Sequence, residues 1–246
     1  MKPPHEYILG THPHNTWLSF NWHNVRHINR FIEDASGRLD RADYAIADIG
    51  GGRSPYYKCF ADRCSSYTVI DVRDSMPANE TRPIIHKEGF AENIPLDDDS
   101  IDIVLCNQVL EHVLDSERST HEIYRILKPG GLFIGSVPHV SPIHLEPYDF
   151  RRFTAIGLEK LLKDHGFSKI TVEGNSGVFS TAAFMIAMDM VLKKHHPGHP
   201  QEMNKIAVAL TFPLVGLLNI GGLIFDSIFG DKGRTPANLC WTATKS

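Results

Sequence analysis

One short stretch of the chain concentrates groups that can move protons. Residues 138–154 hold two histidines, two arginines and three further ionisable side chains in a proline-rich run. Proline stiffens a loop and helps to hold side chains in place. A histidine titrates near neutral pH and can accept a proton from a hydroxyl group. We therefore predict His144, or failing that His139, as a catalytic base, with substrate binding by Tyr148, Asp149, Arg151 and Arg152.

The same loop also has a purely structural interpretation. Asp149 and Arg152 can form an ion pair that only holds the loop together. Thr154 precedes an expected helix over 155–165, and threonine is a favourable N-cap residue. Both interpretations stay open at the level of the sequence.

A glycine turn provides the second chemical feature. The apolar run 45–49 contains Asp48 and leads into Gly50, Gly51 and Gly52. A glycine turn after a strand lets backbone N–H groups approach a ligand without a Cβ in the way. The next apolar run ends at Asp71, about 20 residues further on, where an acid can accept hydrogen bonds from ribose hydroxyls. The pattern predicts a cofactor that contains ribose.

The elements that must position these residues alternate along the chain. We expect strands near 45–49, 67–71, 83–86, 101–106, 132–137, 168–173 and 239–244, with helices at 17–33, 54–62, 116–127 and 155–165. Several strands are continuous apolar runs, as in strands that are buried on both faces. This alternation predicts a doubly wound α/β fold with a mostly parallel sheet. Residues 1–40 would add an N-terminal helical cap to a single domain over 1–246.

Composition narrows the function classes. The chain has 246 residues, 42% hydrophobic and 22% charged, with a formal net charge of -4. Lysine and arginine form no run longer than two, which argues against a nucleic-acid partner. The four cysteines lack the spacing of a zinc site, and we interpret them as reduced thiols of a cytoplasmic protein. His195, His196 and His199 are interpreted as a solvated loop, and no metal site is expected.

Dinucleotide-dependent dehydrogenases use a related turn, G-x-G-x-x-G, whose third glycine lets the helix pack on the strand. Counting from Gly50, that position is Pro55. A nucleotide-dependent oxidoreductase is therefore only an alternative.

Several longer motifs resemble the class I S-adenosylmethionine-dependent methyltransferases, in particular the type 11-like group that acts on small molecules. They run in the family's order as the turn 48–52, the acid Asp71, the strand 99–105, the segment 107–113 and the helix and turn 122–131. The resemblance covers residues 45–173 and the final strand. It implies a Rossmann-like, seven-stranded sheet whose last strand is antiparallel and lies between the fifth and sixth strands. It also implies that the loop 138–154 lies beside the substrate and that its end leads into the next helix.

The resemblance implies S-adenosylmethionine as the cofactor. The residues that would bind it are Asp48, Gly50, Gly51, Gly52, Asp71, Val72, Phe90, Ala91, Glu92, Asn107 and Gln108. Ser54 replaces a common third glycine, and Phe90 stands where the family has an acid for the adenine amine. Phe90 would then flank the adenine, with its amine held by Glu92 or by backbone carbonyls. Glu111 is interpreted as structural, and His112 as structural or substrate-facing.

An apolar segment interrupts the end of the fold. Residues 176–236 separate the last two strands and include 206–225, a stretch without any charge. Twenty apolar residues can span a bilayer, but a span would separate the final strand from its sheet. Pro213, Gly216, Gly221 and Gly222 predict a broken helix. A lid over the substrate and a helix pair in the membrane interface remain as alternatives.

The sequence therefore predicts methyl transfer to a small-molecule, glycan or lipid-linked acceptor, at oxygen. The protein would be cytoplasmic or peripheral at the inner face of a membrane, and its oligomeric state is left open. A cofactor-binding partner protein without catalytic activity is the second alternative.

Overall fold

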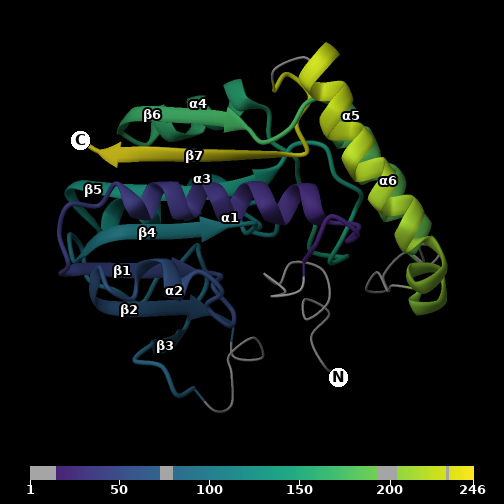
Figure 1. The fold of residues 1–246 in the computed structure, drawn as a ribbon. Coiled ribbons are helices and arrows are strands. Elements are labelled where there is room, and N and C mark those ends of the chain that lie inside the picture. The colour runs from purple at the N-terminus through teal and green to yellow at the C-terminus, as the bar shows by residue number, and fades with distance from the viewer. Residues whose placement is uncertain (1–14, 73–79, 193–203, 231–232) are drawn as a thin grey trace.

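The computed structural model describes residues 15–72, 80–192, 204–230 and 233–246. Its centre is a seven-stranded sheet in the order β3-β2-β1-β4-β5-β7-β6 (Figure 1). The strands are β1 Tyr44–Ile49, β2 Cys64–Asp71, β3 Ile85–Glu88, β4 Ile101–Asn107, β5 Leu127–Pro138, β6 Phe167–Gly174 and β7 Asn238–Lys245. β7 runs antiparallel to both β5 and β6, between which it lies, while the other pairings are parallel. The predicted fold class is confirmed, including the place of the last strand.

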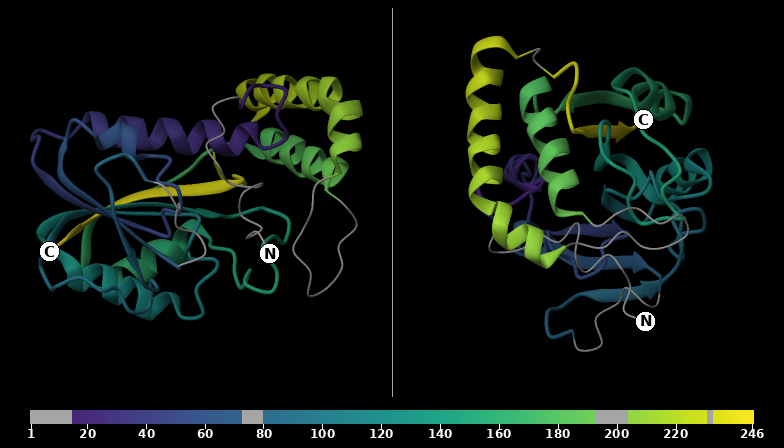
Figure 2. Two further views of the ribbon diagram at one scale, coloured as in Figure 1. Left: turned by 90° about the horizontal axis from the view of Figure 1, so that it is seen from below. Right: turned by 90° about the vertical axis from the view of Figure 1, so that its right-hand side faces the viewer.

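Helices cover both faces of the sheet (Figure 2). They are α1 Trp22–Gly37, α2 Tyr57–Phe60, α3 Ser116–Ile126, α4 Ala155–Asp164, α5 Val178–Val191 and α6 Lys205–Phe229. α1 and α2 pack on one face, where Ile32 and Phe60 meet Ile103 in one buried cluster. α3 and α4 pack on the other face, where Ile123 and Leu158 belong to a second cluster. α1 thus forms a layer of the core rather than a separate cap.

Two helix boundaries follow from capping. Thr154 Oγ1 accepts a hydrogen bond from Gly157 N at 3.0 Å, so the expected N-cap of α4 is present. Gly166, after the end of α4, has φ +88°, a conformation that glycine adopts without a Cβ clash. The N-terminal helix begins at Trp22, five residues later than predicted, because 17–21 form turns.

The apolar segment contributes the helix pair α5 and α6, which stands across the carboxyl ends of the parallel strands (Figure 1). α6 is one continuous helix of 25 residues that contains Pro213, but it is not straight, because it bends sharply near one end (Figure 2). Two polar contacts attach it to the rest of the chain. Asp226 accepts hydrogen bonds from Phe179 N and Ser180 N at the start of α5, at 2.9 and 3.0 Å. The Asn219 amide donates to the carbonyls of Trp17 and Ser19.

Candidate active site

The glycine turn after β1 closes against the end of β2. Gly50 has φ +65° and its N–H donates to Ile70 O at 2.7 Å. A Cβ at Gly50 would lie 2.5 Å from Val109 Cγ2, so both the backbone angle and the available space require glycine. Gly52 has φ +49° and donates to Asp71 Oδ2 at 2.8 Å. The turn and the acid, far apart in the sequence, therefore form one unit.

Asp71 stands at the mouth of this turn. Its second carboxylate oxygen accepts a hydrogen bond from Val72 N at 2.7 Å, which fixes the orientation of the side chain. The side chain remains partly exposed at the carboxyl edge of the sheet. A charged acceptor held in this way is suited to bind the hydroxyl groups of a ribose.

Asp48 lies beneath the turn. It is almost fully buried, and its Oδ2 accepts a hydrogen bond from the Tyr67 hydroxyl at 2.8 Å. Burial raises the pKa of Asp48 to about 7. A Cβ at Gly51 would lie 2.4 Å from the Asp48 Cγ, so the carboxyl group supports the turn from below. No side chain caps α2, so Asp48 does not act as its N-cap.

Arg82 binds the far side of the turn, although it was not among the predicted site residues. Its guanidinium donates to the carbonyls of Arg53 and Ser54 at 2.9 and 3.1 Å. Glu80 pairs with the same guanidinium, and this hydrogen bond lowers the pKa of Glu80 to about 2. Ser54, at the family's third glycine position, adopts φ +53° within this bracket. No motif predicts this role of Arg82, because only the folded chain brings its guanidinium close to residues 53 and 54.

The three residues predicted to lie beside the adenine have different surroundings. Phe90 is 63% exposed and is free to flank a ring, whereas Ala91 is buried in the core. Glu92 also has a contact within the protein, because its Oε1 accepts a hydrogen bond from Leu114 N at 2.9 Å. Its carboxylate thus connects the turn after β4 to the segment 90–95 through one oxygen.

Asn107 and Gln108 end β4 and share one partner on β5. The Ser136 hydroxyl donates to Asn107 Oδ1 at 3.1 Å and accepts from Gln108 Nε2 at 3.2 Å. Gln108 has φ +56°, which turns the chain sharply away from the sheet. Ligands of parallel sheets bind at this edge, so both side chains lie where a cofactor is expected.

A pocket opens beside Gln108. It is lined by Asn21, Asn24, Val25, Gln108, Ser141, His144, Phe184 and Met188. The first three come from the start of α1 and the last two from α5, so the apolar segment forms one wall. His144 is the only ionisable group among these eight lining residues. The pocket has a volume of about 20 Å³, enough for one water molecule, and its lining is mostly uncharged.

The predicted catalytic loop is organised by one buried ion pair. The carboxylate of Asp149 is almost inaccessible and pairs with Arg152, with Oδ2 at 2.7 Å from the Arg152 Nη2. The same oxygen accepts a hydrogen bond from His144 N at 2.8 Å. Arg152 also donates to Pro142 O at 2.8 Å. The structure contains the ion pair of the structural alternative, and neither Asp149 nor Arg152 lines the pocket.

Arg151 and Tyr148 are likewise placed away from the pocket. The Arg151 guanidinium donates to the carbonyls of Leu110, Val113 and Leu114 and so fastens the loop to the turn after β4. The Tyr148 side chain is 63% exposed. Its carbonyl accepts a hydrogen bond from the His112 Nδ1 at 2.8 Å, so its backbone positions a neighbour.

The two histidines predicted as a base differ in their surroundings. The His139 Nδ1 lies 2.7 Å from Phe153 O, and His139 does not line the pocket. His144 is buried, and burial lowers the pKa of its imidazole. A carbonyl of Pro142 lies 3.2 Å from its Nδ1, while its Nε2 has no hydrogen-bond partner. His144 is thus the histidine with an available lone pair at the pocket.

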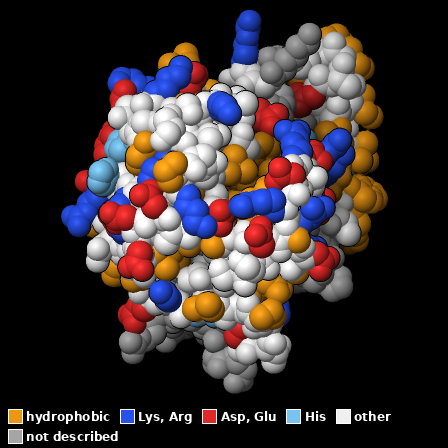
Figure 3. Space-filling model, turned by 90° about the vertical axis from the view of Figure 1, so that its left-hand side faces the viewer, with side chains coloured by type: hydrophobic (Ala, Val, Ile, Leu, Met, Phe, Trp, Pro, Cys, Tyr) orange, Lys and Arg blue, Asp and Glu red, His pale blue; other side chains and the backbone are white. Residues whose placement is uncertain are grey.

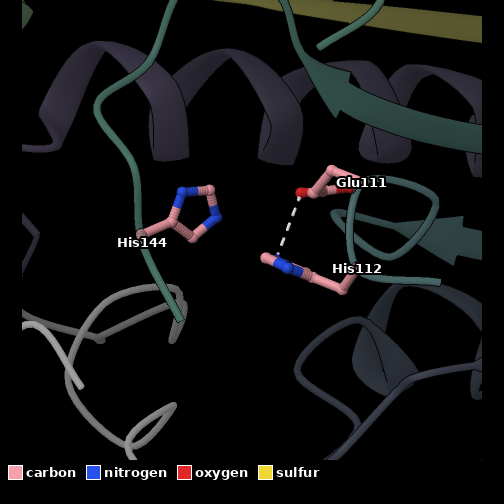
Figure 4. A group of neighbouring side chains, drawn as sticks. All are labelled: Glu111, His112 and His144. Atoms are coloured by element: carbon pink, nitrogen blue, oxygen red, sulfur yellow. Dashed lines mark ion pairs between the residues drawn. The ribbon is translucent and has the colours of Figure 1, made fainter. Parts of the chain in front are cut away.

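Glu111 and His112 converge on His144 (Figure 4). Glu111 is fully buried and lies 3.6 Å from the His112 Nε2, and the two imidazole rings meet edge to face at 4.9 Å. Burial raises the pKa of Glu111 to about 8 and lowers that of His112 to about 4. The sequence assigned these three residues separate roles and did not reveal that they form one group.

The comparisons with known proteins agree with this geometry. The model of a family described as a methyltransferase domain matches residues 47–135. A probable S-adenosylmethionine-dependent methyltransferase of Mycolicibacterium smegmatis is 36% identical over 47% of this chain and 44% of its own length. A ubiquinone biosynthesis O-methyltransferase of Pseudomonas fluorescens is 25% identical over 65% of this chain and 72% of its own.

Solved structures show the same fold. Phosphoethanolamine N-methyltransferase 2 of Haemonchus contortus, in complex with S-adenosyl-L-methionine, superposes with a TM-score of 0.56 and 16% identity. The superposition covers 90% of this chain and 52% of that one. Residues 47–135 thus match a methyltransferase domain, and the fold around them is that of solved S-adenosylmethionine-dependent methyltransferases. Its cofactor is S-adenosylmethionine. The match spans less than half the length of the first relative, 44%.

Replacement of Asp71 by alanine is expected to weaken S-adenosylhomocysteine binding at least about 100-fold, because two hydrogen bonds to a charged acceptor are lost. Titration calorimetry measures the affinity. Asp71→Asn keeps one acceptor oxygen, so it removes the charge together with one of the two backbone bonds from Gly52 N and Val72 N. Asp62→Ala removes an exposed acid as a control. Equal affinities for Asp71→Ala and the unmodified chain would refute the assignment.

Asp48 is expected to make stability fall as pH rises. With a folded pKa of about 7 against an ordinary value of 3.8, the folded state holds a proton that the unfolded state has lost. The free energy of unfolding then decreases between these two pH values, by up to about 1.4 kcal/mol per pH unit. Asp48→Asn stays neutral, so its stability relative to the unmodified chain should grow over this window in urea titrations. Parallel curves for the two proteins would contradict the burial argument, and Asp62→Asn serves as the control.

Proposed function

We propose that the protein transfers the methyl group of S-adenosylmethionine to an oxygen atom of a neutral small-molecule or lipid-linked acceptor. The observation that carries this proposal is the pocket between Gln108, at the cofactor edge of β4, and His144. The acceptor's electron pair would attack the methyl carbon in line with the breaking carbon–sulfur bond. The electrons of that bond go to sulfur, and the acceptor loses its hydroxyl proton.

The lining of the pocket supports a neutral acceptor. Val25, Phe184 and Met188 offer apolar surface, and Asn21 and Asn24 offer uncharged hydrogen-bonding groups. The name of one relative, a ubiquinone biosynthesis O-methyltransferase, describes transfer to oxygen in that protein. A glycan would place many hydroxyl groups against the apolar wall, so we favour the small-molecule or lipid-linked class.

His144 rather than His139 is proposed to activate the acceptor. We expect His144→Ala to lower the rate of methyl transfer by at least about 100-fold, since positioned acid–base groups contribute about that much. His139→Ala should retain most of the rate, because His139 does not line the pocket. The assay follows labelled methyl groups from the cofactor into an organic extract of cells, with cofactor binding as the check for folding.

Unchanged transfer by His144→Ala would rule out this role. Cofactor binding without transfer in any fraction would instead favour the alternative of a non-catalytic partner protein.

A surface feature favours an acceptor that is linked to lipid. Val208–Phe229, within α6, is the one helix in the described ranges that is long and apolar enough to cross a membrane. Ten large apolar side chains of α6 are exposed, and five of them repeat at intervals of four and seven, which places these five on one side of the helix. These five are Ile206, Leu210, Leu217, Ile224 and Ile228. Figure 3 shows an apolar rim, at the right in that view, over α6.

We propose that this side of α6 lies in the membrane interface rather than across the bilayer. Asp226 and Asn219 attach the opposite side of α6 to α5 and to the segment before α1. A spanning helix would have to break both contacts and pull β7 from its place beside β5. Contact through one side leaves the domain folded and leaves α6 between the lipid surface and α5, which carries the buried Phe184 and Met188. The protein would then act at the inner face of a membrane, from the cytoplasm.

Flotation with vesicles of phosphatidylcholine and phosphatidylglycerol tests this contact. The unmodified chain should float, and the double variant Leu210→Glu, Leu217→Glu should remain at the bottom of the gradient. Ile156→Glu is the matched control, because Ile156 is an 82% exposed apolar residue on α4. Failure of the unmodified chain to float, or its assembly into dimers through α6, would overturn the membrane proposal.

A further inference from the structure

Four buried polar atoms face one another beside the pocket without any hydrogen-bond partner. They are both carboxylate oxygens of Glu111, the His112 Nε2 and the His144 Nε2. One ligand atom from each residue lies within 4.8 Å of the others. Burying a polar group without a hydrogen-bond partner is unfavourable, so several such groups in one place indicate a missing ligand.

A backbone carbonyl beside each Nδ1 determines the tautomer of both histidines. The His112 Nδ1 lies 2.8 Å from Tyr148 O, and the His144 Nδ1 lies 3.2 Å from Pro142 O. A carbonyl only accepts, so each Nδ1 carries the hydrogen and each Nε2 presents a lone pair to the centre. Histidines that bind metals are held in this manner, with the second ring nitrogen donating to an oxygen. The buried Asp149 adds a further restraint through His144 N.

We propose that Glu111, His112 and His144 bind one divalent first-row transition cation, such as Zn²⁺ or Mn²⁺. Two imidazoles and one carboxylate form a known ligand set for these ions, whereas Mg²⁺ and Ca²⁺ prefer oxygen ligands alone. A tetrahedral ion with bonds of about 2.0–2.1 Å holds its ligand atoms roughly 3.3 Å apart. The Glu111–His112 distance of 3.6 Å is close to this value, and His144 needs to approach by less than 2 Å.

Three protein ligands leave at least one coordination position open. His144 lines the acceptor pocket, so an acceptor oxygen can reach that position. This step rests on the proposed function and changes one role in it: His144 binds the cation through Nε2, and the cation rather than the imidazole activates the acceptor. Bound to the cation, the hydroxyl group of the acceptor loses its proton to solvent more readily. The resulting oxygen anion supplies the electron pair for the new carbon–oxygen bond, while the carbon–sulfur electrons leave with S-adenosylhomocysteine.

Cobalt serves as the test probe, because Co²⁺ bound by nitrogen ligands absorbs visible light independently of activity. Chelator-treated full-length protein should take up one Co²⁺ with a new absorption band, and Zn²⁺ should displace it. His144→Ala and the isosteric Glu111→Gln should weaken Co²⁺ binding at least 100-fold while S-adenosylhomocysteine still binds. His121→Ala, an exposed histidine on α3, should bind Co²⁺ like the unmodified chain.

These experiments test the metal site and its role in methyl transfer separately. No cobalt band, or an equal band in Glu111→Gln, would overturn the metal site. Methyl transfer at an unchanged rate after metal removal would overturn its role in activating the acceptor. A cobalt site in a protein that transfers no methyl group would support the metal site and contradict the proposed function.

Discussion

Parallel pairing brings the carboxyl ends of β1, β2, β4 and β5 to one edge, and every functional residue depends on how the chain leaves that edge. The first exit is the glycine turn, closed by the hydrogen bond from Gly52 N–H to Asp71. The second is the turn at Gln108, and the third is the loop after Pro138. Because neighbouring strands place these turns side by side, the cofactor turn and the pocket lie next to each other. Gly50 packs on Val109, and the adjacent Gln108 lines the pocket.

The loop after β5 is built around a different constraint, a charge that must be neutralised within the protein. Asp149 is buried, and its pairing with Arg152 offsets the cost of removing the carboxylate from water. The same carboxylate holds His144 N, so the ion pair also places the imidazole. Arg151 binds this loop to the turn that carries Glu111 and His112. Residues that looked like substrate ligands are thus the scaffold that brings the three possible metal ligands together.

Local patterns predicted most of the fold and part of the site. The glycines of 50–52 and Asp71 could be assigned because a turn and a strand end are short-range features with strict backbone requirements. The roles of Arg82 and Glu92 could not, since each depends on a partner, Ser54 O or Leu114 N, that only the folded chain brings near. Pro213 predicted a break in α6, but packing against α5 and the contacts of Asp226 and Asn219 maintain one helix. Glu111 and His144 meet across 33 positions of sequence, a distance at which no spacing rule applies.

Transfer of the methyl group to oxygen is the central claim, and the fate of the methyl carbon tests it most directly. The protein can be incubated with S-adenosylmethionine carrying a ¹³C-labelled methyl group and with fractionated cell extract, and the products examined by carbon NMR. The account predicts one new methyl resonance with the chemical shift of a methyl ether, in the organic-soluble fraction, and its absence with Asp71→Ala. A methyl group on nitrogen or carbon, or no labelled product despite bound cofactor, would contradict it.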